Sequence, residues 1–162
     1  MRSTLNFIIL IFIISFLLNL FWEVSHSPLY DWKQPPLENT VDYYIPKILK
    51  ATISDAFYVT LIFLIVTLIN RNINWINKPT QKNLLIIIIL GLVISISIEV
   101  KAKILNQWTY NDLMPQIFGI GLTPLIQLAL TSLITLYIIN SLCFVRKLKT
   151  AKVNSLYKKS LK

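Results

Sequence analysis

The sequence has only one cysteine, one histidine and three glycines, and each scarcity excludes a class of protein. The single Cys143 cannot form a disulfide within the chain, which excludes a disulfide-stabilised scaffold. The single His26 excludes a metal site built from several histidines. Four common catalytic and nucleotide-binding motifs are also absent: G-x-x-x-x-G-K-[ST], H-E-x-x-H, C-x-x-C and G-x-S-x-G. We therefore expect neither a metal nor a cofactor.

Charged residues are scarce as well, at 14% of the chain, whereas soluble domains have about 25%. Hydrophobic residues make up 55%, and the mean hydropathy is +0.63. This composition excludes a disordered chain and is typical of a membrane protein. The net charge of +9 would indicate a nucleic-acid partner in a soluble protein. Here we expect no such partner, because the basic residues follow a membrane topology.

Four apolar runs are long enough to cross a bilayer, which takes about 20 mostly apolar residues. They predict helices at about 5–22, 51–69, 84–102 and 124–145. The predicted fold is an all-α membrane protein, a bundle of four transmembrane helices in a single domain over residues 1–145. A basic cytoplasmic tail follows over residues 146–162. We interpret the first run as a retained helix, because no small-x-small cleavage site follows it.

The basic residues predict the orientation of this bundle. Eleven of the 16 Lys and Arg residues fall before the first helix, between the second and third, or in the tail. This bias places both termini in the cytoplasm of a bacterial inner membrane, with the tail against anionic headgroups. All seven acidic residues fall on the outer side or at the outer ends of the helices: Glu23, Asp31, Glu38, Asp42, Asp55, Glu99 and Asp112. The positive-inside rule concerns Lys and Arg and does not by itself require this segregation of the acids.

Three of these acids lie at the outer ends of the predicted helices. Glu23 ends the first helix, Asp55 lies early in the second, and Glu99 lies late in the third. Ionisable groups inside a membrane are costly and usually face the interior of a bundle. We therefore expect the three acids to converge, and we regard them as candidate catalytic residues. Three side chains share a helical face with Glu23 and are candidate binding residues: Asn19, Trp22 and His26.

The segment before the fourth helix is too apolar and aromatic for an ordinary loop. Its Pro and Gly residues interrupt regular helix, so we predict an interfacial or re-entrant stretch over the bundle. This stretch would bring Trp108 and Tyr110 toward the acids, although both also suit an aromatic belt at the membrane surface. We expect Thr123 to cap the fourth helix, with Pro124 as its first residue.

Gln127 belongs to a polar ridge that runs along the predicted fourth helix. The ridge consists of residues four apart, which lie one above another on a helix: Thr123, Gln127, Thr131 and Thr135. We regard Gln127 as a further candidate binding residue, because it lies near the outer end, where the acids are expected.

Two motifs resemble those of a family of small bacterial multi-pass membrane proteins of unassigned function. The first is W-E-x-x-H-x-P-L-Y, from Trp22 to Tyr30. The second is W-x-Y-x-x-x-M-P from Trp108 to Pro115, continued by G-x-G-L-x-P-L-x-Q from Gly119 to Gln127. The resemblance covers most of the chain, and it implies a multi-pass membrane protein without implying an activity.

Asn19, Trp22 and Glu23 are also loosely similar to an element of integral-membrane terpene and lycopene cyclases. That resemblance implies intramembrane acids that protonate an isoprenoid. The acidic pair that can follow the proline in lycopene cyclases is replaced here by Leu125 and Ile126.

Three functions are compatible with these residues. The first is an acid–base enzyme, of isomerase or cyclase type, acting on an isoprenoid or other lipid through an outward-facing site. The second is a non-enzymatic lipid-binding module, complex subunit or assembly factor. The third is a small transporter. It is the least favoured of the three, because the chain has only four predicted helices and no internal repeat. Expected partners are membrane lipids, a hydrophobic small molecule, and a second copy of the chain or another membrane protein.

Overall fold

Four long helices make up most of the molecule. The computed structural model describes residues 2–33, 37 and 40–160, with side chains described for 4–33, 37 and 40–143. The long helices are α1 (Arg2–His26), α2 (Val41–Asn70), α3 (Gln81–Ile104) and α4 (Leu122–Ser160). Two short 3₁₀ helices, η1 (Ser27–Leu29) and η2 (Ile73–Asn77), follow α1 and α2. A hairpin of β1 (Gln116–Ile117) and β2 (Ile120–Gly121) precedes α4.

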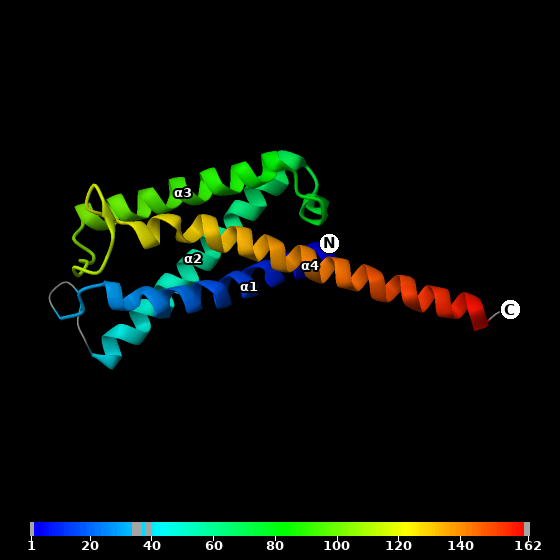
Figure 1. Ribbon diagram of the computed structural model, residues 1–162, viewed down its shortest axis with the longest axis horizontal. Coiled ribbons are helices and arrows are strands. Elements are labelled where there is room, and N and C mark those ends of the chain that lie inside the picture. The colour runs from blue at the N-terminus through cyan, green and yellow to red at the C-terminus, as the bar shows by residue number, and fades with distance from the viewer. Residues whose placement is uncertain (1, 34–36, 38–39, 161–162) are drawn as a thin grey trace.

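The predicted all-α four-helix bundle is confirmed. All four helices contain a segment long and apolar enough to cross a membrane. Helix α1 packs mainly against α2 and also against α4, while α3 packs mainly against α4 (Figure 1). Large apolar side chains are exposed on the outside of the bundle, for example Leu17, Phe57, Leu85 and Val93. Such exposure is expected for helices that contact lipid. We call the end at which α1 and α3 finish and α2 and α4 begin the site end.

All four helices extend beyond the apolar runs, and α2 and α4 do so most. Helix α2 begins at Val41, ten residues before the predicted position, because the polar residues at its start do not count toward a membrane span although they are helical. Helix α4 continues to Ser160 and projects beyond the bundle (Figure 1), so the predicted tail is helical. Its sequence after residue 145 is rich in Lys and Leu and has no Pro or Gly to end a helix. The basic side chains of this tail are not among the side chains that the structure describes.

The segment before α4 contains the β1–β2 hairpin, which the sequence did not lead us to expect. Its strands have two residues each, too few for an alternating pattern to be visible. The turn residues Phe118 and Gly119 have φ of 53° and 74°, the left-handed pair of a type I′ turn. Lys103 donates a hydrogen bond from Nζ to the Phe118 carbonyl at 3.1 Å, which attaches the hairpin to the end of α3.

The expected cap of α4 is wrong. The helix begins at Leu122, and the Thr123 hydroxyl donates instead to the Met114 sulfur at 3.2 Å. Leu122 N–H bonds to the Pro115 carbonyl at 2.8 Å, so the chain before the helix satisfies an N–H at its start.

Helices α3 and α4 approach each other closely at Gly91. A Cβ atom built on Gly91 would lie 2.6 Å from both the Cα and the backbone N of Ala129. Because these are backbone atoms, no side-chain rotation can make room for a methyl group. The crossing of α3 over α4 therefore depends on the missing side chain at residue 91.

We expect Gly91→Ala to force α3 away from α4 and to lower the free energy of unfolding by about 2 kcal/mol, as overpacking does elsewhere. Thermal unfolding of the purified protein in detergent measures this loss. Val93→Ala on the lipid-exposed face of the same helix is the control, and we expect a much smaller change there. An equal effect of the two substitutions would contradict the close-approach explanation.

Candidate functional site

Three side-chain oxygens from two helices surround one amide nitrogen at the site end. Gln127 Nε2 lies 3.2 Å from Asn19 Oδ1, 2.8 Å from Glu23 Oε1 and 2.7 Å from Asp55 Oδ2. We call these four residues the amide cluster. Asn19, Glu23 and Gln127 are all less than 10% exposed, so the cluster lies within the bundle.

Helix geometry explains how these residues meet. Asn19 and Glu23 are one turn apart on α1 and point the same way. Asn19 donates from Nδ2 to the Ser15 carbonyl at 2.8 Å, which leaves its oxygen directed at Gln127. Asp55 comes from α2, and Gln127 comes from the second turn of α4. The cluster therefore ties three helices together at one point.

The amide cluster has too few amide protons for its acceptors. A glutamine amide carries two N–H protons, and three oxygens lie around Gln127 Nε2. The Glu23 and Asp55 carboxyl groups are also hydrogen-bond neighbours of each other. Two ionised carboxylates in contact inside a bundle repel each other, and one shared proton removes the repulsion. The geometry therefore favours a carboxyl pair that holds one proton.

Glu99 lies in a second, adjoining group that we call the tyrosine cluster. The Tyr110 hydroxyl donates a hydrogen bond to Glu99 Oε2, and Trp108 Nε1 donates to the Tyr110 oxygen at 3.2 Å. The backbone of Gly121 also bonds to Tyr110. Burial, together with Glu99, holds the pKa of Tyr110 well above its ordinary value. Tyr110 is therefore a hydrogen-bond donor at neutral pH.

Tyr30 joins the two clusters. Its ring centroid lies 5.4 Å from that of Tyr110, 6.3 Å from that of Trp108 and 5.3 Å from that of His26. Burial raises the pKa of Tyr30, and the negative charge of Glu23 and Glu99 raises it further. The tyrosine thus stays neutral and experiences the field of acids from both clusters.

His26 has a fixed orientation beside Tyr30. Its Nδ1 lies 2.8 Å from the Trp22 carbonyl, which can only accept, so Nδ1 carries a proton. Nε2 lies 3.3 Å from the Tyr30 hydroxyl and accepts from it when the imidazole is neutral. The histidine therefore positions Tyr30.

Backbone hydrogen bonds hold Tyr30 next to the segment before α4. Tyr30 and Tyr110 form an isolated antiparallel bridge. Asp31 N–H donates to the Thr109 carbonyl at 3.0 Å, and Asn111 N–H donates to the Leu29 carbonyl at 3.1 Å. The chain after α1 and the chain before α4 are thereby held together over the two clusters.

The structure brings together most of the residues selected from the sequence. Glu23 and Asp55 meet in the amide cluster with Asn19 and Gln127. Glu99 does not join the amide nitrogen but bonds to Tyr110, because α3 presents it toward the segment before α4. Three further selected side chains lie in or beside the tyrosine cluster: Trp108, Tyr110 and His26.

The rings of Trp22 and Tyr30 both lie beside His26. Trp22 lies with its ring centroid 6.2 Å from that of His26, and its buried Nε1 has no hydrogen-bond partner among the described residues. Tyr30 was not among the selected site residues, although its ring packs against those of His26, Trp108 and Tyr110. The sequence signal that could have identified Tyr30 is its place in the first motif, four residues after His26.

Within the described residues, no three His, Cys, Asp or Glu side chains are arranged to hold a metal ion. No family model, curated protein or solved structure matches this chain.

We expect Gln127→Leu to leave the oxygens of three side chains without their shared donor. Loss of a donor to buried charged groups should lower the free energy of unfolding by about 3 kcal/mol. Thermal or denaturant unfolding in detergent measures the change. Gln81→Leu, at an exposed position at the start of α3, is the matched control and should change stability little. Similar stabilities for the two variants would show that the amide is dispensable.

Proposed function

We propose that this protein is an intramembrane acid–base enzyme, of isomerase or cyclase type, acting on an isoprenoid or other lipid. The observation that carries the proposal is the Glu23–Asp55 carboxyl pair, in which Glu23 is buried and Asp55 half-buried, and which shares one Gln127 amide between three helices. A bundle that needed these residues only for packing would be expected to use apolar side chains, which avoid the desolvation of two carboxyl groups.

A carboxyl pair that shares one proton can perform a proton exchange without a co-reactant. The protonated member donates its proton to one carbon of an alkene, which leaves a carbocation on the neighbouring carbon. The ionised member then removes a proton from an adjacent carbon, and the electrons of that C–H bond form a new double bond. The pair ends with one proton, as it began. An isomerisation or ring closure of an unsaturated lipid meets this balance.

The aromatic rings beside the pair suit the charge of such an intermediate. Trp22, Tyr30, Trp108 and Tyr110 are half-buried around the two clusters. The negative faces of aromatic rings attract a cation, and this attraction strengthens where water is excluded. Glu99 accepts a hydrogen bond from the Tyr110 hydroxyl and thereby holds this ring in place at the site end.

We expect Glu23→Gln and Asp55→Asn each to reduce turnover at least about 100-fold, the usual contribution of a general acid or base. Each substitution keeps the shape of the side chain but removes its ability to carry an exchangeable acidic proton. The measurement compares, by mass spectrometry, the lipid extracts of cells that express the wild-type protein, each variant or no protein. Asp112→Asn, at an exposed acid outside both clusters, is the control and should retain the wild-type lipid pattern.

The same experiment separates the enzyme from a lipid-binding module. A lipid whose abundance changes with the wild-type protein, but not with Glu23→Gln or Asp55→Asn, supports the enzyme. A lipid that co-purifies unchanged with the wild type and with both folded variants, while no cellular lipid is altered, would overturn the acid–base proposal in favour of binding.

We also propose that the site end faces away from the cytoplasm of a bacterial inner membrane, with both termini inside. The excess of Lys and Arg at the opposite end of the helices supports this orientation. In a Cys143→Ala background, Asp112→Cys should react with a membrane-impermeant thiol reagent in intact cells. Thr150→Cys, beyond the apolar part of α4, should react only after permeabilisation. The reverse pattern would contradict the orientation.

A further inference from the structure

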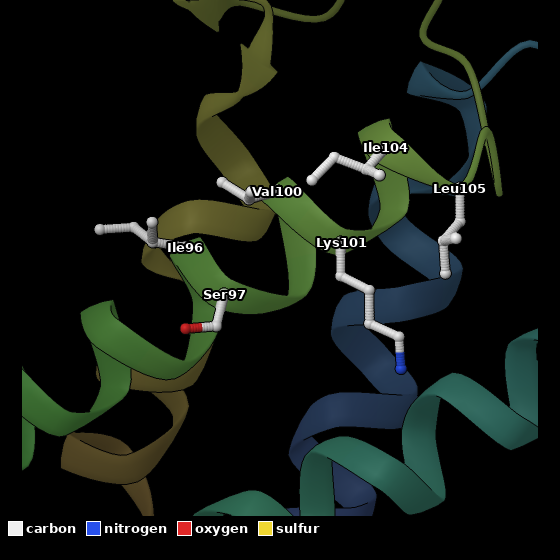
Figure 2. A pocket seen from close by; sticks show the side chains of 6 residues that line it. All are labelled: Ile96, Ser97, Val100, Lys101, Ile104 and Leu105. Atoms are coloured by element: carbon white, nitrogen blue, oxygen red, sulfur yellow. The ribbon is translucent and has the colours of Figure 1, made fainter.

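A groove of about 520 Å³ runs along the outer face of α3 near the site end. Two rows of side chains border it, each made of residues four apart (Figure 2). One row is entirely apolar: Ile96, Val100 and Ile104. The other is of mixed character: Ser97, Lys101 and Leu105. The groove thus combines an apolar floor for a hydrocarbon chain with one ammonium group near the end of the helix.

Lys101 differs from the neighbouring lysines because its charge has no partner. Lys103 donates to the Phe118 carbonyl at 3.1 Å. Lys47 donates to the Gln107 carbonyl at 3.5 Å and lies 5.9 Å from the centroid of the Trp108 ring. In the part of the chain with described side chains, the Lys101 ammonium group makes no hydrogen bond or ion pair. Its ammonium group is free to receive an anion from outside the protein.

The groove is separate from the carboxyl site. Lys101 and Glu99 are two residues apart on α3, which places their side chains about 200° apart around the helix. Glu99 is buried against Tyr110, whereas Val100, Ile104 and Leu105 are 41–76% exposed. A molecule in the groove therefore lies on the side of α3 that faces the surrounding membrane.

We propose that this groove binds an anionic phospholipid of the surrounding leaflet, with its phosphate on Lys101 and one acyl chain along Ile96 and Val100. Charge complementarity selects the headgroup, because the one charged group lining the groove is a cation without a partner among the described side chains. Lys101 lies less than one turn from the end of α3, where a lysine reaches the headgroup level while its stem stays in apolar surroundings. The proposal concerns a face distinct from the carboxyl pair and does not depend on catalysis there.

The test is titration of the delipidated protein in detergent with phosphatidylglycerol or phosphatidylcholine of the same acyl chains, followed by native mass spectrometry. The wild type should retain phosphatidylglycerol in preference to phosphatidylcholine. Lys101→Gln should weaken that binding about tenfold, the loss expected for one charge-assisted contact, and abolish the preference. Val100→Trp, which fills the groove, should weaken it as well. Lys50→Gln removes another exposed lysine at the site end and should bind as the wild type does.

Three outcomes would overturn the proposal. The first is equal retention of phosphatidylglycerol by Lys101→Gln and wild type. The second is equal retention of both lipids by the wild type, which would indicate an unspecific lipid contact. The third is a loss of dimers rather than of bound lipid in Lys101→Gln and Val100→Trp, which would assign the groove to a second copy of the chain. The thermal midpoint of each variant verifies folding, and the exposed Lys101→Gln should retain that of the wild type.

Discussion

The amide of Gln127 is the interaction on which the site end depends. It is the group through which α4 reaches the polar residues of both α1 and α2. Without it, two carboxyl groups would face each other inside the bundle with no donor between them. With it, the cluster still has one acceptor more than the amide has protons, so a proton on the carboxyl pair completes the arrangement. The shared proton that relieves the repulsion in the cluster is thus also the proton on which the proposed acid–base chemistry depends.

The close packing of α3 on α4 positions the other half of the site. Gly91 allows the two backbones to touch near the middle of α3, and from there α3 carries Glu99 toward the hairpin that precedes α4. At Gly121 the hairpin also lies against Tyr110, where an added Cβ would be 3.0 Å from the ring. The position of Tyr110, and hence its bond to Glu99, therefore follows from close contacts at two glycines.

Much of this arrangement could be predicted from sequence, but not all of it. The apolar runs identify the four helices, and helical phase places Asn19 and Glu23 on one face. The bond from Gln127 to that face needs the register of α1 against α4, which periodicity does not encode. The bond of Glu99 depends on a loop tyrosine, and the central place of Tyr30 depends on backbone pairing between two loops. Both belong to irregular segments, where no repeat indicates which side chains will meet.

The distribution of buried ionisable groups bears on the choice between an enzyme and a transporter. Polar groups surround Gln127, and one turn farther along α4 the buried Thr131 and Ser132 follow. Farther along, Ile62, Phe63 and Ile139 are fully or almost fully buried, but buried polar residues continue among them, including Thr60, Thr135 and Asn83. Proton transport across a membrane commonly uses a relay of ionisable side chains along the path. Among the described residues, the buried ionisable side chains Glu23, His26 and Glu99 all lie at the site end, so the bundle lacks such a relay along its length and a small transporter is the less favoured alternative.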